Sequence, residues 1–196
     1  LLPLLLAVSP ITGLSAPLTI PDEHRQKLNS PLVDGGDVFF AQVSPDGNTA
    51  VYIADQDTNG VWELYSVPLG NGDVTNTHVA WKQTSKANVP HTPSVLLIKD
   101  DLFLISDTGI ASSLDARTGK LHYRKRIGGS YSASPTFADG KIYIQSEAGR
   151  GFVLKPGREF VELGRNQLEG RTFASYAVAD NALFIRTETQ MFRIER

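Results

Sequence analysis

The chain has 196 residues, of which 19 are basic and 21 acidic, so its formal net charge is −2, and it contains 17 glycines, 11 prolines and no cysteine. The balanced charge, without a basic patch, argues against a nucleic-acid partner, and the lack of cysteine excludes disulfides, thiol catalysis and zinc–thiolate sites. The length suffices for one sizeable domain or two small ones, and the abundant glycine and proline favour a turn-rich β architecture.

The chain opens on an apolar segment, residues 1–16 (LLPLLLAVSPITGLSA), that carries no charge. It is too short, and too often interrupted by proline and glycine, to span a membrane. We interpret it as the remnant of a secretory signal peptide, with Leu14-Ser15-Ala16 as the cleavage site, which predicts a secreted or periplasmic protein. A buried N-terminal strand is the alternative, although the segment lacks the period-two pattern of a strand. Residues 17–32 then form a polar, proline-marked connector.

Residues 33–77 have the pattern of a first unit of antiparallel strands. Alternating runs occupy residues 38–43, 49–54 and 61–69, and Asp, Asn and Gly mark the turns between them. The turn Ser44-Pro-Asp-Gly47, followed by a strand and then by the letters ELYSV, resembles a blade of the TolB-like, WD-type β-propellers of bacteria. This resemblance implies a single TolB-like blade at residues 33–77.

A repeat follows this first unit. Residues 100–127 contain three short alternating runs separated by Asp- and Gly-containing turns, as expected of strands joined by hairpins. Residues 131–163 repeat the pattern, and a third copy begins at Ala174. The spacing is regular, because Asp180 follows its counterpart Asp139 by 41 residues. A period of about 40 residues with about four short strands per copy predicts propeller blades rather than a sandwich.

The most specific motif of the repeat is Leu114-Asp-Ala-Arg-Thr-Gly-Lys-Leu121, and it resembles the PQQ-like (pyrroloquinoline-quinone-type) propeller repeat. The resemblance spans residues 78–196. It implies an all-β fold of four-stranded antiparallel blades around an axis, in proteins that are mostly secreted or periplasmic. The chain has material for about four blades, which is fewer than such propellers usually have. We therefore expect a partial or incomplete β-propeller.

A single blade cannot bury both faces of its sheet, so neighbouring blades share a core. Six apolar residues at matching positions are expected between blades: Leu102, Leu104, Ile142, Ile144, Leu183 and Ile185. An open arc of blades leaves two apolar faces exposed, which predicts self-association through these faces. The strands at residues 38–43 and 190–194 are the candidates for closing a ring.

One loop has the spacing of a calcium site. Asp55, Asp57, Asn59 and Glu63 occupy the first, third, fifth and ninth positions of a D-x-D-x-N-G sequence, in which Gly60 permits a sharp turn. Oxygen ligands with this spacing wrap hard cations such as Ca²⁺. The bidentate glutamate of an EF-hand is replaced by a serine at the twelfth position. The interpretation we favour is a polar hairpin loop whose side chains cap their own backbone.

No other motif indicates catalysis. The quinone-dependent dehydrogenases with this fold hold their cofactor with adjacent, disulfide-bonded cysteines and a calcium site, and neither matches residues here, so we expect no bound PQQ. The histidines lack metal-ligand spacing, and His91 is expected on the surface where propeller loops meet. Four aromatic residues are expected to pack between blades rather than to bind a sugar: Trp62, Trp81, Tyr123 and Tyr131. The basic run Arg124-Lys-Arg126 is expected to be a solvated edge that deters strand pairing.

These features predict a non-catalytic, secreted or periplasmic scaffold. It would bind a protein partner or a small ligand on the loops at one end of the propeller, without nucleic acid and without a membrane span. The alternative is the propeller part of an enzyme, either a quinone- or calcium-dependent oxidoreductase or the gating domain of a hydrolase.

Overall fold

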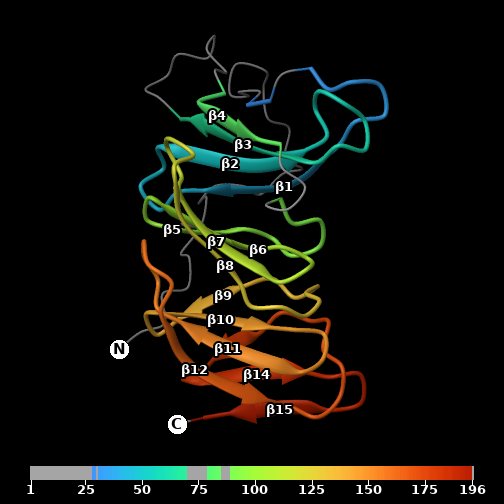
Figure 1. The fold of residues 1–196 in the computed structure, drawn as a ribbon, viewed down its shortest axis with the longest axis vertical. Coiled ribbons are helices and arrows are strands. Elements are labelled where there is room, and N and C mark those ends of the chain that lie inside the picture. The colour runs from blue at the N-terminus through green and yellow to red at the C-terminus, as the bar shows by residue number, and fades with distance from the viewer. Residues whose placement is uncertain (1–27, 30, 70–78, 85–88, 196) are drawn as a thin grey trace, which may run out of the picture.

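A computed structural model describes residues 28–29, 31–69, 79–84 and 89–195. These residues form fifteen strands in four antiparallel sheets and contain no helix, which confirms the all-β prediction. Figure 1 shows the sheets following one another along the long axis of the molecule in chain order. The signal-peptide remnant predicted at residues 1–16 lies outside the described residues, as does most of the connector at 17–32.

The first sheet, blade 1, has the order β1-β2-β3-β4. Its strands are β1 (Val38–Val43), β2 (Thr49–Ala54), β3 (Glu63–Pro68) and β4 (Trp81–Gln83). The last strand lies beyond residue 77, where the sequence suggested that the first blade ends. It belongs to blade 1 because it pairs with β3, with Leu64 opposite Gln83 and Ser66 opposite Trp81.

Blades 2 and 3 have the same four-stranded order, and blade 4 has three described strands. Blade 2 comprises β5 (Leu96–Ile98), β6 (Asp101–Ile105), β7 (Ile110–Asp115) and β8 (Leu121–Arg126). Blade 3 comprises β9 (Thr136–Ala138), β10 (Lys141–Gln145), β11 (Arg150–Leu154) and β12 (Glu162–Gln167), and blade 4 comprises β13 (Ala177–Ala179), β14 (Ala182–Arg186) and β15 (Met191–Ile194).

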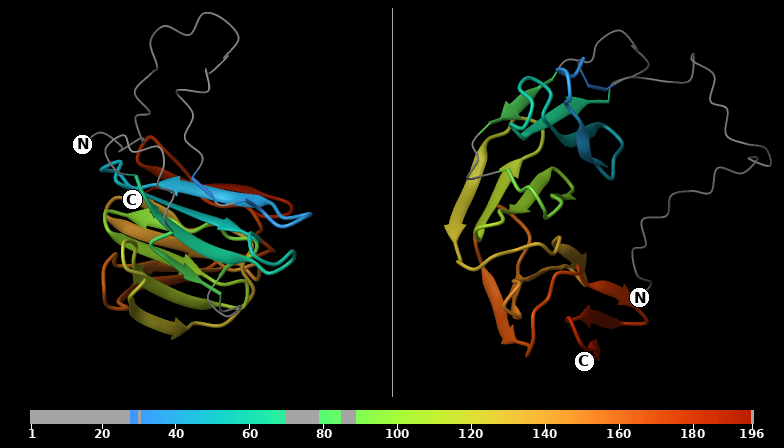
Figure 2. Two further views of the ribbon diagram at one scale, coloured as in Figure 1. Left: turned by 90° about the horizontal axis from the view of Figure 1, so that it is seen from above. Right: turned by 90° about the vertical axis from the view of Figure 1, so that its right-hand side faces the viewer.

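The blades form an open arc, as the right-hand view of Figure 2 shows. The first strands of the blades face the concave side of the arc, and the last strands, β8 and β12, lie on the convex side. Sheet order and burial agree with this view, because the side chains of β8 and β12 are mostly exposed while those of the middle strands are mostly buried. The four sheets therefore stand side by side as propeller blades, not face to face as a sandwich.

Apolar cores join blade 1 to blade 2 and blade 2 to blade 3. The first core contains Val51, Ile53, Leu64, Leu97, Leu102, Leu104 and Leu114 among its buried residues. The second contains Phe103, Ile105, Ala111, Tyr131, Ile142, Ile144, Phe152 and Leu154. Alternation along the strands explains the division, because β6 directs Leu102 and Leu104 to blade 1 and Phe103 and Ile105 to blade 3. The predicted inter-blade positions are thus confirmed for blades 2 and 3.

The interface between blades 3 and 4 is more polar than the first two. The hydroxyl of Tyr176 donates to Oε1 of Gln145, whose Nε2 is buried without a hydrogen-bond partner. The hydroxyl of Thr172 donates to the Ser146 carbonyl at 2.6 Å. At the matching positions of blade 4, Ile185 is buried and Leu183 is half-buried. The core thus thins toward the C-terminal blade.

Serine side chains at matching positions of the repeat link blade 2 to blade 3 and blade 3 to blade 4. The amide of Ser94 donates to Oγ of Ser134 at 2.9 Å, and the amide of Ser134 donates to Oγ of Ser175 at 2.8 Å. The turns beside these links are close-packed. At Gly149, with φ +78°, an added Cβ would lie 2.2 Å from the carbonyl oxygen of Leu168.

Both outer faces, on blades 1 and 4, were expected to be apolar and exposed, but the outer face of blade 1 is buried. On the outer face of blade 1, Tyr52, Tyr65 and Val67 are at most 3% exposed and form a small buried cluster. The outer face of blade 4 carries Met191, which is 70% exposed. It also carries Arg186, opposite Met191 in the register of β14 and β15. An exposed apolar face at the start of the arc was therefore a wrong prediction, because Tyr52 and Tyr65 stack on each other within a buried cluster.

Candidate functional site

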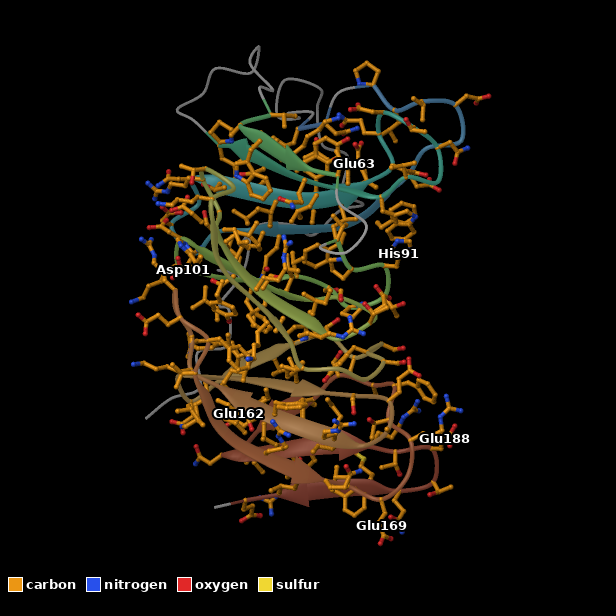
Figure 3. All side chains as sticks on the ribbon, in the orientation of Figure 1. Glu63, His91, Asp101, Glu162, Glu169 and Glu188 are labelled. Carbon is orange, nitrogen blue, oxygen red and sulfur yellow. The ribbon has the colours of Figure 1, made fainter. Side chains whose placement is uncertain are left out.

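The loops of the blades gather at two opposite ends of the arc. Figure 3 shows Glu63, His91, Glu169 and Glu188 at one end and Asp101 and Glu162 toward the other. We call these the His91 end and the Asp101 end. The His91 end carries the β2–β3, β6–β7, β10–β11 and β14–β15 loops and the connections that lead from each blade to the next. In a propeller these loops surround one mouth of the axis, where binding residues can converge from several blades.

Three stacked rings lie at the His91 end. The ring of Trp62 stacks on Phe39 with centroids 3.6 Å apart, and on its other side on His91 with centroids 4.8 Å apart. Phe39 is 43% exposed and His91 is exposed, while Trp62 is partly buried against the core between blades 1 and 2. The aromatic stack therefore has a rigid centre and exposed outer members, which is the composition favoured in protein-binding surfaces.

Asp107 fixes the position of His91. The carboxylate of Asp107, in the β6–β7 turn, accepts hydrogen bonds from the backbone amides of His91 at 2.8 Å and Thr92 at 3.0 Å. These bonds satisfy two amides of the β4–β5 connection and hold the imidazole over Trp62. The stack thus joins two blades, because Phe39 and Trp62 come from blade 1 while His91 leads into blade 2.

The loop predicted as a calcium site lies at the same end, and its polar side chains are engaged within the protein. The carboxylate of Asp55 is buried and accepts the backbone amides of Asp37 at 2.5 Å and Gly60 at 2.9 Å, and these bonds lower its pKa. The side-chain amide of Asn59 donates to the Asp34 carbonyl at 3.2 Å.

The two remaining acids of this loop bind a lysine. Lys82 on β4 forms ion pairs with Asp57 and, at 3.3 Å, with Glu63. The hydrogen bond from Lys82 to Asp57 raises the pKa of the lysine. Glu63 also accepts the hydroxyl of Tyr65, whose pKa is raised by burial and by that carboxylate. Across the part of the chain that the structure describes, no three His, Asp or Glu side chains group so as to hold a metal ion.

A second polar cluster at the His91 end connects blades 3 and 4. The guanidinium of Arg171 lies 4.6 Å from the ring centroid of Phe173 and between two acids, 3.7 Å from Glu147 and 3.8 Å from Glu188. Phe173 is 39% exposed. This cluster and the aromatic stack place exposed aromatic rings over both halves of the arc.

The other residues named in the sequence analysis have structural roles. Trp81, Tyr123 and Tyr131 pack against or within the inter-blade cores, as predicted. Ser132 and Ser134 make structural contacts, because Ser132 donates to Glu147 and Ser134 links two blades. Sequence reasoning missed the stack as a unit, since Phe39 and His91 are far apart in the chain and neither lies in a motif.

Comparison with known proteins agrees with this architecture. Residues 70–158 match the family model described as outer membrane protein assembly factor BamB. This segment carries PQQ-like β-propeller repeats. No curated protein sequence matches the chain. The family match begins at residue 70 and does not include β1, β2 or β3 of blade 1. The TolB-like type of that blade therefore stays a prediction.

Two solved structures show the same propeller fold. The crystal structure of BamB from Moraxella catarrhalis matches with a TM-score of 0.61 at 16% identity, over 79% of this chain and 45% of that one. A chain in the crystal structure of the mitotic checkpoint complex matches with a TM-score of 0.60 at 10% identity, over 82% of this chain and 50% of that one. The chain therefore spans about half the length of each of these two matching chains.

The residues present do not fit the quinone site that the name of the repeat suggests. The chain has no cysteine for the disulfide described above. The acids nearest to a calcium pattern, Asp55, Asp57 and Glu63, already bind amides, a lysine and a tyrosine of the same blade. Within the described residues, no helix is long and apolar enough to cross a membrane.

Proposed function

We propose that this chain is a non-catalytic propeller scaffold, secreted or periplasmic, that binds a protein partner at the His91 end. The observation that carries the proposal is the stack of Phe39, Trp62 and His91, which presents exposed rings on a rigid, partly buried tryptophan. Anchored aromatic rings are the residues that dominate binding energy in protein interfaces. The matching family is described as an assembly factor, which supports a role in binding other proteins.

Site-specific photo-crosslinking in the native cell tests this proposal. A photoreactive phenylalanine analogue replaces His91 in one variant and, as the control, the half-exposed Leu163 on the outer strand β12 in another. We expect a discrete adduct with one protein from position 91 and none from position 163. The adduct should disappear when Phe39→Ser is added, because that change removes an exposed ring without opening the core. Equal labelling at both positions, or no adduct at position 91, would refute docking at this end.

Two further measurements separate the scaffold from an enzyme. Reconstitution with PQQ and calcium, followed by dye-linked alcohol oxidation, should give no turnover, and any turnover would overturn the non-catalytic role. Calcium titration followed by thermal unfolding should give no stabilisation, because Asp55 would have to give up its bonds to two backbone amides. A rise in Tm at millimolar calcium that Asp57→Asn abolishes would instead establish the calcium loop.

A further inference from the structure

The Asp101 end contains a cavity of about 340 Å³ between blades 2 and 3. Its walls are mainly apolar and come from both blades, with Ile98 and Phe103 on one side and Phe137 and Ile142 on the other. Lys99 and Asp101 lie among its polar lining residues. The volume falls within the range of about 300–1,000 Å³ that is usual for small-molecule sites. We call this cavity the crevice.

The corresponding space between blades 1 and 2 is smaller, about 210 Å³, and a tryptophan occupies part of the gap. The ring of Trp81 packs so closely on the β7–β8 turn that a Cβ added at Gly119 would lie 2.7 Å from it. Its Nε1 donates to the carbonyl of Ala116 at 2.9 Å, and the hydroxyl of Ser66 donates to the same carbonyl at 2.7 Å. Blade 1 thus narrows the gap to the next blade with a large side chain.

Blade 2 has a smaller ring at the matching position. Tyr123 lies opposite Ser113 on the outer strand, as Trp81 lies opposite Ser66 in blade 1. Tyr123 packs edge-on against Phe160, with centroids 5.7 Å apart. Because the ring is smaller and turned toward Phe160, the space beside Ser113 is larger than the space beside Ser66, and Ser113 lines the crevice.

The turn between β5 and β6, which lines the crevice, has a lysine in the left-handed conformation. Lys99 has φ 55°, and the matching residues of blades 3 and 4, Asp139 and Asp180, each have φ 47°. Aspartate is among the residues enriched in this left-handed conformation, whereas lysine is not. Blade 2 therefore places a cation, against the backbone preference, where the other two repeats have an acid. Backbone strain of this kind is concentrated at binding sites.

Of the two charged residues that line the crevice, Lys99 and Asp101, only Lys99 has no ion pair among the described residues. Asp101 already accepts Nε of Arg158 at 3.1 Å, and Nε2 of His122 lies 3.3 Å from the same oxygen without hydrogen-bond geometry. No ion pair of Lys99 occurs among the described residues. A ligand that enters the crevice therefore meets an apolar slot with one free ammonium group beside it.

We propose that the crevice binds a small molecule that has an apolar, ring-sized body and one carboxylate. The ring lies between Phe103 and Phe137, and the carboxylate pairs with the Lys99 ammonium. A charge-assisted hydrogen bond in such a partly dry site fixes the orientation of the ligand. This site is independent of the His91 end, because the two lie at opposite ends of the arc (Figure 3).

Calorimetric titration of the full chain with 2-naphthoate, and with neutral 2-naphthamide for comparison, tests the site. We expect saturable binding of 2-naphthoate that is about tenfold tighter than binding of the amide, as one charge-assisted hydrogen bond gives. Lys99→Asn should remove that difference without unfolding the protein, because asparagine accepts the positive φ of this turn. The control Lys120→Asn removes an exposed cation on the β7–β8 turn of the same blade and should change neither affinity.

A second variant tests the location. Tyr123→Trp copies the side chain that narrows the gap between blades 1 and 2, so it should weaken the binding of both compounds. Circular dichroism and the Tm confirm that the variant is folded. The absence of saturable 2-naphthoate binding to the wild-type protein would overturn the proposal. Unchanged affinity in Lys99→Asn, or in folded Tyr123→Trp, would overturn it as well.

Discussion

Substitution of one glycine in blade 3 should destabilise the fold by an amount that the structure separates into two parts. Gly149→Ala places a side chain on a backbone with φ +78°, and the new Cβ would lie 2.2 Å from the Leu168 carbonyl oxygen. The left-handed conformation costs about 1–2 kcal/mol for a residue with a Cβ. Overpacking adds about 1–3 kcal/mol. The contact cannot simply widen, because the amide of Leu168 donates to the Gly149 carbonyl at 2.8 Å.

Gly140→Ala in the same blade is the matched control. Gly140 has φ +68°, and nothing lies within 4 Å of a Cβ built there. It should therefore lose only the conformational part, about 1–2 kcal/mol, while Gly149→Ala loses roughly 2–5 kcal/mol in total. Urea unfolding followed by far-ultraviolet circular dichroism measures both differences. Equal losses in the two variants would refute the reasoning, because they would show that the close approach to Leu168 contributes nothing.

Three further predictions follow from single contacts. Ser134→Ala removes the acceptor of the Ser94 amide, so hydrogen exchange of that amide should accelerate and stability should fall by about 1–3 kcal/mol; unchanged exchange at Ser94 would contradict the link. The hydroxyl of Ser44, with backbone and side-chain bonds from the same turn, lowers the pKa of Asp46 to about 2. The ionised carboxylate of Asp46 therefore stabilises the fold above pH 3.8, and this contribution is lost as the pH falls toward 2. The difference in urea midpoint between wild type and Asp46→Asn should close in that window, and a constant difference would count against the prediction. Burial raises the pKa of Tyr52 to about 12, so Tyr52→Phe should reduce the loss of stability between pH 10 and 12, as measured by alkaline thermal unfolding; an identical alkaline profile would disprove this.

Much of the fold could be predicted from the sequence because each strand is short and ends at a turn residue with a required conformation. The predicted runs at 38–43 and 49–54 coincide with β1 and β2. The strands β5, β9 and β13 have three residues each, too few to show a period. The sequence predicts that the first blade ends at residue 77, before β4, because the polar residues 70–77 separate β4 from β3.

The candidate sites could be predicted only in part. The calcium pattern depended on residue types and spacing, but the backbone turns Asp55 toward amide donors and brings Lys82 to Asp57, which a spacing rule does not include. The aromatic stack requires contact between residues from two blades, and it depends on the packing of Trp62. The crevice depends on the difference between one indole and one phenol ring at equivalent positions.

The links from Ser94 to Ser134 and from Ser134 to Ser175 join successive blades at nearly constant sequence intervals. Such links constrain how the gene can change over evolution. Duplication or deletion of a whole module preserves the donor and acceptor pairing, so the number of modules can vary while each junction remains intact. A frame-preserving gain or loss of a few codons within a module would be accepted in a loop, but it would leave a backbone amide at the junction without its acceptor if it shifted one of these serines.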